Sequence, residues 1–161
     1  MSRARLLARR AVIGSLGVLL LIQLVPYGRR HTNPPVAAEP KWDSPATREL
    51  FFRACKDCHS NETRWPWYSW VAPSSWLVQW DVDQARKQFN ISEWNRTDQE
   101  GYQASKLVTE DWMPPNKYLI AHAHARLAAA DKAALVAGLA ATFGTRRPKG
   151  PRDLQESIEM P

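Results

Sequence analysis

Five consecutive residues, Cys55-Lys56-Asp57-Cys58-His59, contain both cysteines of the chain. Two thiols three positions apart on one helical turn can add to the two vinyl groups of a single porphyrin. The adjacent histidine is then placed to bind the iron as an axial ligand. The spacing therefore predicts one covalent c-type haem, attached through Cys55 and Cys58, with His59 as the proximal ligand.

Two other chemistries use a C-x-x-C pair. A thioredoxin-type dithiol is expected in a βαβ unit, but the residues preceding Cys55 have helical rather than strand periodicity. A zinc site would combine Cys55 and Cys58 with two of the three histidines at positions 59, 122 and 124, without the usual second pair of ligands. A zinc-stabilised interaction domain therefore stays open as an alternative to haem.

The basic charge of the chain is confined to its N-terminal end. The formal net charge is +6, and residues 1–30 contain six arginines and no acidic residue. Residues 31–161 contain 16 basic and 16 acidic side chains. The C-terminal part therefore has no excess charge with which to attract a polyanion, and no nucleic-acid partner is expected.

The N-terminal charge pattern is typical of a membrane signal anchor. Residues 1–10 form a basic segment, and the uncharged residues 11–28 are predicted to be a single transmembrane helix. Arginines are more numerous before this run than after it, which predicts a cytoplasmic N-terminus and a domain on the periplasmic side of a bacterial inner membrane. A cleaved signal, with a late site near Ala37 and Ala38, is the alternative. Export agrees with haem c, which bacteria attach after export.

The exported part divides into three regions. Residues 29–43 are a proline-rich linker, residues 44–144 are the predicted haem-binding domain, and residues 145–161 are predicted to be a disordered tail. Apolar residues recur at three- and four-residue steps, and no segment alternates as a strand would. The fold class expected is all-α, a small cytochrome c-like domain with helices near residues 44–58, 73–89, 98–109, 117–127 and 130–143.

The second axial ligand decides whether the iron carries electrons or binds ligands. Met113 is the leading candidate, because a thioether is a soft ligand and Pro114 and Pro115 would stiffen its loop. His122 is the alternative ligand, with His124 beside it, and a methionine packed in the core is the ordinary structural explanation of Met113.

The haem pocket is expected to be aromatic, since the chain contains eight tryptophans. Some of these residues are expected to do no more than fill a small core. The candidates for haem contact are Trp65, Trp67, Trp76, Pro114 and Tyr118.

Several segments resemble a bacterial haem-binding domain family related to class I cytochromes c. The resemblance is carried by residues 58–69, 72–73, 75–78, 81–82, 90–94 and 113–115, and by Tyr118, His122, Ala125 and Leu127. It implies an exported, membrane-anchored domain with one covalent haem, ligated by His59 and Met113. The chain departs from the family pattern at Ala85, where the family has glycine, and at Ala123, where it has proline.

These observations lead to an expected function and two alternatives. The first is one-electron transfer by a membrane-anchored periplasmic haem protein, with a redox partner protein that the sequence does not identify. The second is a haem-based sensor or small-ligand binder in which the methionine ligand dissociates, and the third is the zinc-stabilised domain. No enzymatic activity is expected, because nothing resembles the distal arginine and histidine of a peroxidase.

Overall fold

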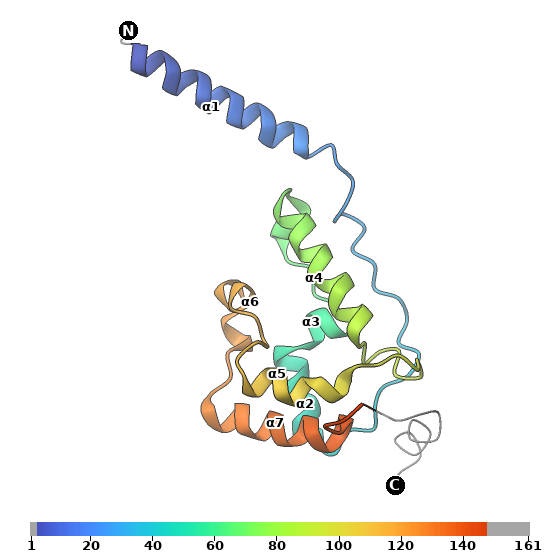
Figure 1. Ribbon diagram of the computed structural model, residues 1–161. Helices are drawn as coiled ribbons and strands as arrows, with labels where there is room; N and C mark the ends of the chain where they lie inside the picture. Colours follow the sequence, from blue (N-terminus) through green and yellow to red (C-terminus); the bar gives the residue numbers. More distant parts are fainter. Residues whose placement is uncertain (1–2, 148–161) are drawn as a thin grey trace. The chain divides into compact units, whose positions relative to one another are not determined.

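The computed structural model describes residues 3–147, and within them the secondary structure is helical (Figure 1). These residues contain no strand, and their one β-bridge joins Ala38 and Glu93. The all-α prediction is therefore confirmed. In chain order the elements are α1 (Arg3–Ile22), α2 (Pro45–Ala54), α3 (Lys56–His59), η1 (Trp67–Trp70), α4 (Ser74–Gln88), η2 (Gly101–Gln103), α5 (Ala104–Thr109), α6 (Asn116–Ala121), η3 (Ala123–Ala125) and α7 (Ala129–Phe143).

The chain forms two compact units, which are described separately. Unit 1 consists of residues 3–31 and Trp65–Asp81, so it contains α1, η1 and the first half of α4. Unit 2 consists of Thr32–Arg64 and residues 82–147, so it contains α2, α3, the end of α4 and all later helices. The C-x-x-C-H run and Met113 lie in unit 2.

The helix ends of unit 2 follow local sequence signals. The Ser44 side chain caps α2 by accepting a hydrogen bond from the Thr47 N–H, and Pro45 occupies the first turn, where its missing N–H is not needed. At the other end of the domain, α7 stops at Gly144, whose φ of 73° is readily adopted only without a side chain. Both boundaries were predicted from the sequence.

The N-terminal helix differs from the segment expected to span a membrane. It begins at Arg3 and ends at Ile22, whereas the expected run covered residues 11–28. The extension through the arginines has a simple cause, because arginine, leucine and alanine are all strong helix formers. Residues 23–28 form turns and irregular structure instead.

In residues 3–147, no helix combines the length and the apolar character needed to cross a bilayer.

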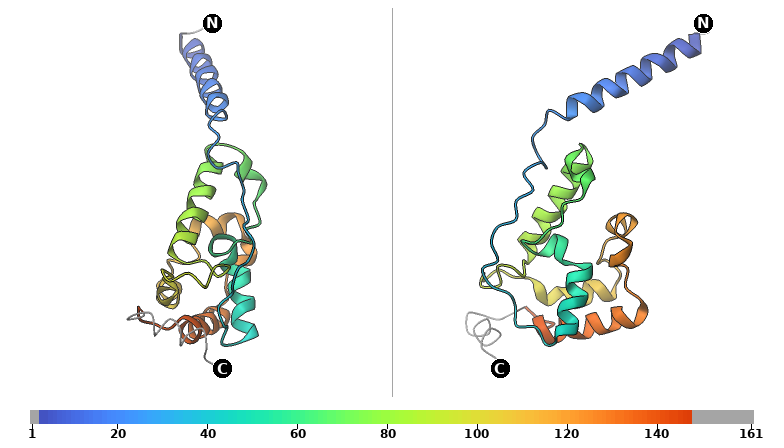
Figure 2. Two further views of the ribbon diagram at one scale, coloured as in Figure 1. Left: turned by 90° about the vertical axis from the view of Figure 1, so that its right-hand side faces the viewer. Right: turned by 180° about the vertical axis from the view of Figure 1, so that it is seen from behind.

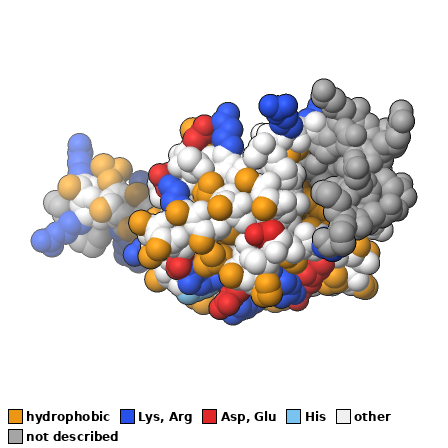
Figure 3. Space-filling view, turned by 90° about the horizontal axis from the view of Figure 1, so that it is seen from below, with side chains coloured by type: hydrophobic (Ala, Val, Ile, Leu, Met, Phe, Trp, Pro, Cys, Tyr) orange, Lys and Arg blue, Asp and Glu red, His pale blue; other side chains and the backbone are white. Residues whose placement is uncertain are grey.

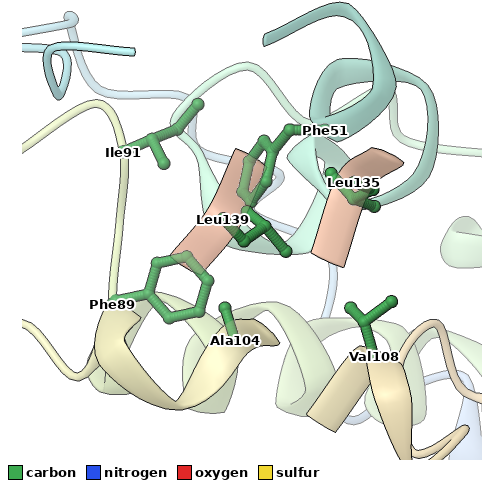
Figure 4. Close-up of a cluster of buried hydrophobic side chains, with 7 residues drawn as sticks. All are labelled: Phe51, Phe89, Ile91, Ala104, Val108, Leu135 and Leu139. Atoms are coloured by element: carbon green, nitrogen blue, oxygen red, sulfur yellow. The ribbon is translucent and has the colours of Figure 1, made fainter. Parts of the chain in front are cut away.

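The core of unit 2 lies between α2, α5 and α7. Figure 2 shows α2 crossing α7, with α5 alongside α7. Gly138 permits this crossing, because a Cβ placed there would lie 2.0 Å from Thr47 Oγ1. The core cluster, shown in Figure 4, consists of Phe51, Phe89, Ile91, Ala104, Val108, Leu135 and Leu139.

Part of the segment expected to be a spacer belongs to the folded unit. The backbone N–H groups of Ala37 and Ala38 donate to Ser92 O at 2.8 and 3.2 Å, and Trp94 N–H donates to Ala38 O at 3.0 Å. Pro40 is buried. Alternation and proline content did not reveal this pairing, because its partner lies more than 50 residues further along the chain.

The surface of unit 2 is of mixed charge. The face seen in Figure 3 has basic and acidic side chains interspersed with hydrophobic ones. This agrees with the balanced charge of residues 31–161. Most of the predicted disordered tail, residues 148–161, lies outside the described residues.

Candidate haem site

The C-x-x-C-H run forms a tight helical corner at the end of α2. Cys55 terminates α2, with its N–H donating to Phe51 O at 2.8 Å, and α3 begins at the next residue. The N–H groups of Cys58 and His59 both donate to Cys55 O, at 3.2 and 3.1 Å. The two cysteines and the histidine therefore occupy one turn, and neither cysteine is in a disulfide. This is the local arrangement that the spacing predicted.

His59 is buried, and one of its ring nitrogens contacts a backbone carbonyl. Its side chain stacks on Phe89, with ring centroids 4.0 Å apart, and its Nδ1 lies 3.2 Å from Phe89 O. With Nδ1–H as the donor in this bond, the second nitrogen, Nε2, keeps its lone pair. Burial lowers the pKa of His59 to about 4, although the hydrogen bonds to backbone carbonyls oppose the shift. The imidazole is therefore neutral at neutral pH, which is the form that binds metals.

The Cys55 thiol has the protonation expected of a packed cysteine. Cys55 contacts the core cluster, and burial, with a smaller contribution from Cys58, raises the pKa of its thiol to about 12. A low-pKa redox thiolate is the opposite case, since it needs positive charge or a helix N-terminus nearby. The described residues also lack the strand that a thioredoxin-type motif requires.

The zinc alternative is not supported by the geometry. No group of three or more His, Cys, Asp or Glu side chains among residues 3–147 is arranged to hold a metal ion. The ring of His59 faces Phe89, and that of His122 stacks on Tyr118 with centroids 4.0 Å apart.

A buried polar network fixes the loop that follows His59. Asn61 N–H donates to Ser92 Oγ at 2.9 Å, Asn90 Nδ2 donates to Asn61 Oδ1 at 2.7 Å, and Ser92 N–H donates to Asn90 Oδ1 at 3.0 Å. Ile91 N–H donates to His59 O at 2.9 Å, so the network also contacts the backbone of His59. Because these buried polar groups satisfy one another, they restrain the backbone at His59.

Arg86 is a second support that sequence reasoning did not assign. Its guanidinium donates to Ser60 O at 2.9 Å and to Thr63 Oγ1 at 2.9 Å, both in the loop after His59, and to Thr32 O at 3.0 Å and Asn33 Oδ1 at 3.1 Å. Burial lowers its pKa. An arginine on a polar helix face is usually solvated, so the residue type did not predict this role. Arg86 was distinguished only by following Ala85, where the chain departs from the family pattern.

The Met113 loop is joined by a side-chain contact to residues 55–59, which are called the attachment turn after the haem attachment that the sequence predicts there. Tyr118 Oη donates to Asp57 Oδ2 at 2.9 Å, and Asp57 stands between the two cysteines. Asp57 Oδ1 accepts from the Arg64 N–H at 3.2 Å, so both carboxylate oxygens are engaged. Burial, followed by the Asp57 charge, raises the pKa of Tyr118 above its usual range. Residues 61 positions apart are thereby brought to one side of unit 2.

Met113 itself is half-buried and packs against the core cluster. Its N–H donates to Leu107 O at 3.2 Å, at the end of α5, and Pro115 immediately precedes α6. Pro114 is half-buried beside it. His122, the alternative ligand, has its Nδ1 3.0 Å from Tyr118 O. His122 Nδ1 is therefore already within hydrogen-bond distance of the Tyr118 carbonyl oxygen.

The tryptophans expected in the pocket lie in unit 1. Trp65 stacks on His31 with ring centroids 4.5 Å apart, Trp67 is 79% exposed, and Trp76 is half-buried. The structure therefore groups Cys55, Cys58, His59, Met113, Pro114 and Tyr118 in unit 2 and leaves these three tryptophans outside that group. In unit 2, Trp42 and Trp94 pack against the core, which is the ordinary role of aromatic residues in a small domain.

The donor set fits haem. A small all-α unit offers two neighbouring cysteines that form no disulfide, together with a buried neutral histidine and a soft thioether, which are side chains that proteins use to ligate iron in haem. Residues 17–141 match the haem-binding domain family over more than half of the chain, so the chain belongs to that family. It is a haem-binding protein, with haem as its cofactor. No curated protein and no solved structure matches the chain.

Proposed function

We propose that this chain is a c-type haem protein, in which one haem is held by thioether bonds to Cys55 and Cys58. His59 is the proposed proximal ligand and Met113 the proposed distal ligand. The observation that carries the proposal is the corner at residues 55–59, where two cysteines that form no disulfide and a buried neutral imidazole share one turn. When bound there, haem supplies a one-electron iron couple, and a Met/His ligand pair favours a higher reduction potential.

Electron transfer is the proposed physiological role. The polar network and Arg86 restrain the loop that follows His59, and this restraint suits an iron that changes charge without rearranging its ligands. The competing role, a sensor or small-ligand binder, requires Met113 to leave the iron. The half-buried position of Met113 is the observation that keeps this second role in view.

Export to the bacterial periplasm, with residues 1–28 attaching the domain to the inner membrane and the N-terminus in the cytoplasm, is part of the same proposal. It is supported by the arginines preceding an apolar run and by the attachment of haem c after export. A redox partner protein on that side of the membrane would exchange electrons with the domain.

The test is to produce the full chain in a host with cytochrome c maturation and to extract it with acidified acetone. Haem that stays with the protein, with sharp low-spin bands on reduction and a weak red Met–iron band on oxidation, is the expected result. The matched control replaces both Cys55 and Cys58 by serine, and this variant should lose its haem to the solvent. Extraction of all haem from the parent protein would refute covalent attachment.

A further inference from the structure

Unit 1 contains an aromatic segment without charge. From Trp65 to Trp80 no residue is acidic or basic, and five of the eight tryptophans of the chain lie in these 16 positions. Large apolar side chains are usually covered, but Trp67 is 79% exposed, Trp70 57% and Trp80 54%. Val71 and Leu77 are also about half exposed, at 49% and 50%. We refer to Trp67, Trp70, Val71, Leu77 and Trp80 as the tryptophan surface.

The same segment is bonded to the residues that follow α1. Gln23 Nε2 donates to Ala72 O at 2.9 Å, and Ala72 N–H donates to Gln23 Oε1 at 2.9 Å, so one amide side chain pairs with both backbone groups. Gly28 lies against the Ser75 backbone, where a Cβ would come within 2.4 Å of the carbonyl oxygen. His31 lies 3.0 Å from Ser69 O and contacts the Trp70 ring edge-on at 4.2 Å.

These bonds connect the segment to a helix that is itself uncovered. None of the residues of α1 is buried, and Leu20 and Leu21 near its C-terminal end are 72% and 65% exposed, while Leu24, just beyond the helix, is 78% exposed. The charges of unit 1 are six arginines and the single acid Asp81, so its balance is strongly basic. Arg29 and Arg30 stand between the apolar run and the point where His31 meets the aromatic segment.

We propose that the tryptophan surface rests in the headgroup region of a lipid bilayer and orients the haem domain on the membrane. Tryptophan suits this region because its ring is apolar while its indole N–H remains hydrated, and arginines beside it pair with anionic headgroups. Residues 65–80 include no acidic side chain, so this segment does not repel anionic lipid. The inference rests on the proposed attachment of residues 1–28 to the membrane, but adds a second, independent contact.

A second copy of the chain is a less suitable occupant. A self-associating surface would bring the basic residues of two copies of unit 1 together, whereas anionic lipid neutralises them. The lipid surface therefore accounts for both the aromatic exposure and the charge.

The experiment uses the full-length haem protein, labelled with 5-fluorotryptophan and reconstituted in nanodiscs of phosphatidylethanolamine and phosphatidylglycerol. Fluorine resonances of Trp67, Trp70 and Trp112 are assigned by single Trp→Phe substitutions. The reduced protein is then measured with a headgroup gadolinium-chelate lipid and with its lutetium equivalent. Trp112, which is 67% exposed and lies in unit 2, is measured for comparison.

The expected result is that Trp67 and Trp70 lose at least half of their signal with gadolinium relative to lutetium. Equal signals of Trp67 and Trp70 in the two lipids would overturn the proposal. Resonances that shift with protein concentration but not with gadolinium would instead assign the surface to a second copy. Protein that does not elute with the nanodiscs would show that the attachment of residues 1–28 has failed, a result distinct from the other outcomes.

Discussion

The hydrogen bond between Tyr118 and Asp57 gives a sharp prediction about the proposed distal ligand. Tyr118 lies in α6, five residues after Met113, and its hydroxyl contacts the carboxylate between the two attachment cysteines at 2.9 Å. If Met113 leaves the iron, its loop must move away from the attachment turn, and this contact opposes the movement. Replacing Tyr118 by phenylalanine removes the hydroxyl and keeps the ring that stacks on His122.

The size of the effect follows from the chemistry of the bond. A hydrogen bond to a charged group contributes about 1.5–3 kcal/mol, and a value at or below the lower end of that range is expected because both side chains are half-buried and Asp57 keeps its bond to the Arg64 N–H. A change of about 1–2 kcal/mol corresponds to a factor of about 5–30 in an equilibrium constant. The Tyr118→Phe protein should therefore bind imidazole at the oxidised iron about 5–30 times more tightly than the parent.

The assay is a titration of the oxidised protein with imidazole, followed by the loss of the weak red Met–iron band. Tyr102→Phe is the matched control, because the hydroxyl of Tyr102 only accepts a hydrogen bond from Gln103 Nε2 at 3.3 Å and contacts no carboxylate in the attachment turn. Its imidazole affinity should equal that of the parent. An unchanged affinity in Tyr118→Phe, with the Met–iron band present, would show that the contact does not restrain the Met113 loop.

Three further predictions concern the ligands and the helix crossing. His59→Ala should abolish the low-spin visible spectrum, because no other imidazole is placed in the attachment turn, and an unchanged spectrum would rule out the proximal assignment. Met113→Ala should retain haem through acid-acetone extraction but bind CO on reduction, and CO binding no better than in the parent would exclude Met113 as ligand. Gly138→Ala should lower the free energy of unfolding, measured in urea, by about 1–2 kcal/mol, since crowding against Thr47 outweighs the helix propensity gained. Gly17→Ala is its control, because nothing lies within 4 Å of the added Cβ. A change in the free energy of unfolding at Gly138 equal to that of the control, or an increase, would contradict the crossing geometry.

Local signals in the sequence account for two helix ends and one turn of unit 2. Ser44 and Pro45 mark the start of α2, Gly144 marks the end of α7, and the C-x-x-C-H spacing predicted one turn carrying the thiols and His59. These features succeed because capping, proline and left-handed glycine act within a few residues. The predicted bounds of the N-terminal helix, residues 11–28, were wrong. Helix propensity extends α1 through the arginines, so that the helix begins at Arg3.

The sequence by itself determined the residue types of the site and their spacing along the chain, which is why haem was predicted. Only the tertiary structure decided which distant groups hold them: Phe89 O against His59, Asn90 against Asn61, and Tyr118 against Asp57. It also placed Trp67 and Trp76 in a different unit from His59. The physical reason is that such contacts join residues about 30 to 60 positions apart, and periodicity and local propensity contain no information about where two remote segments meet.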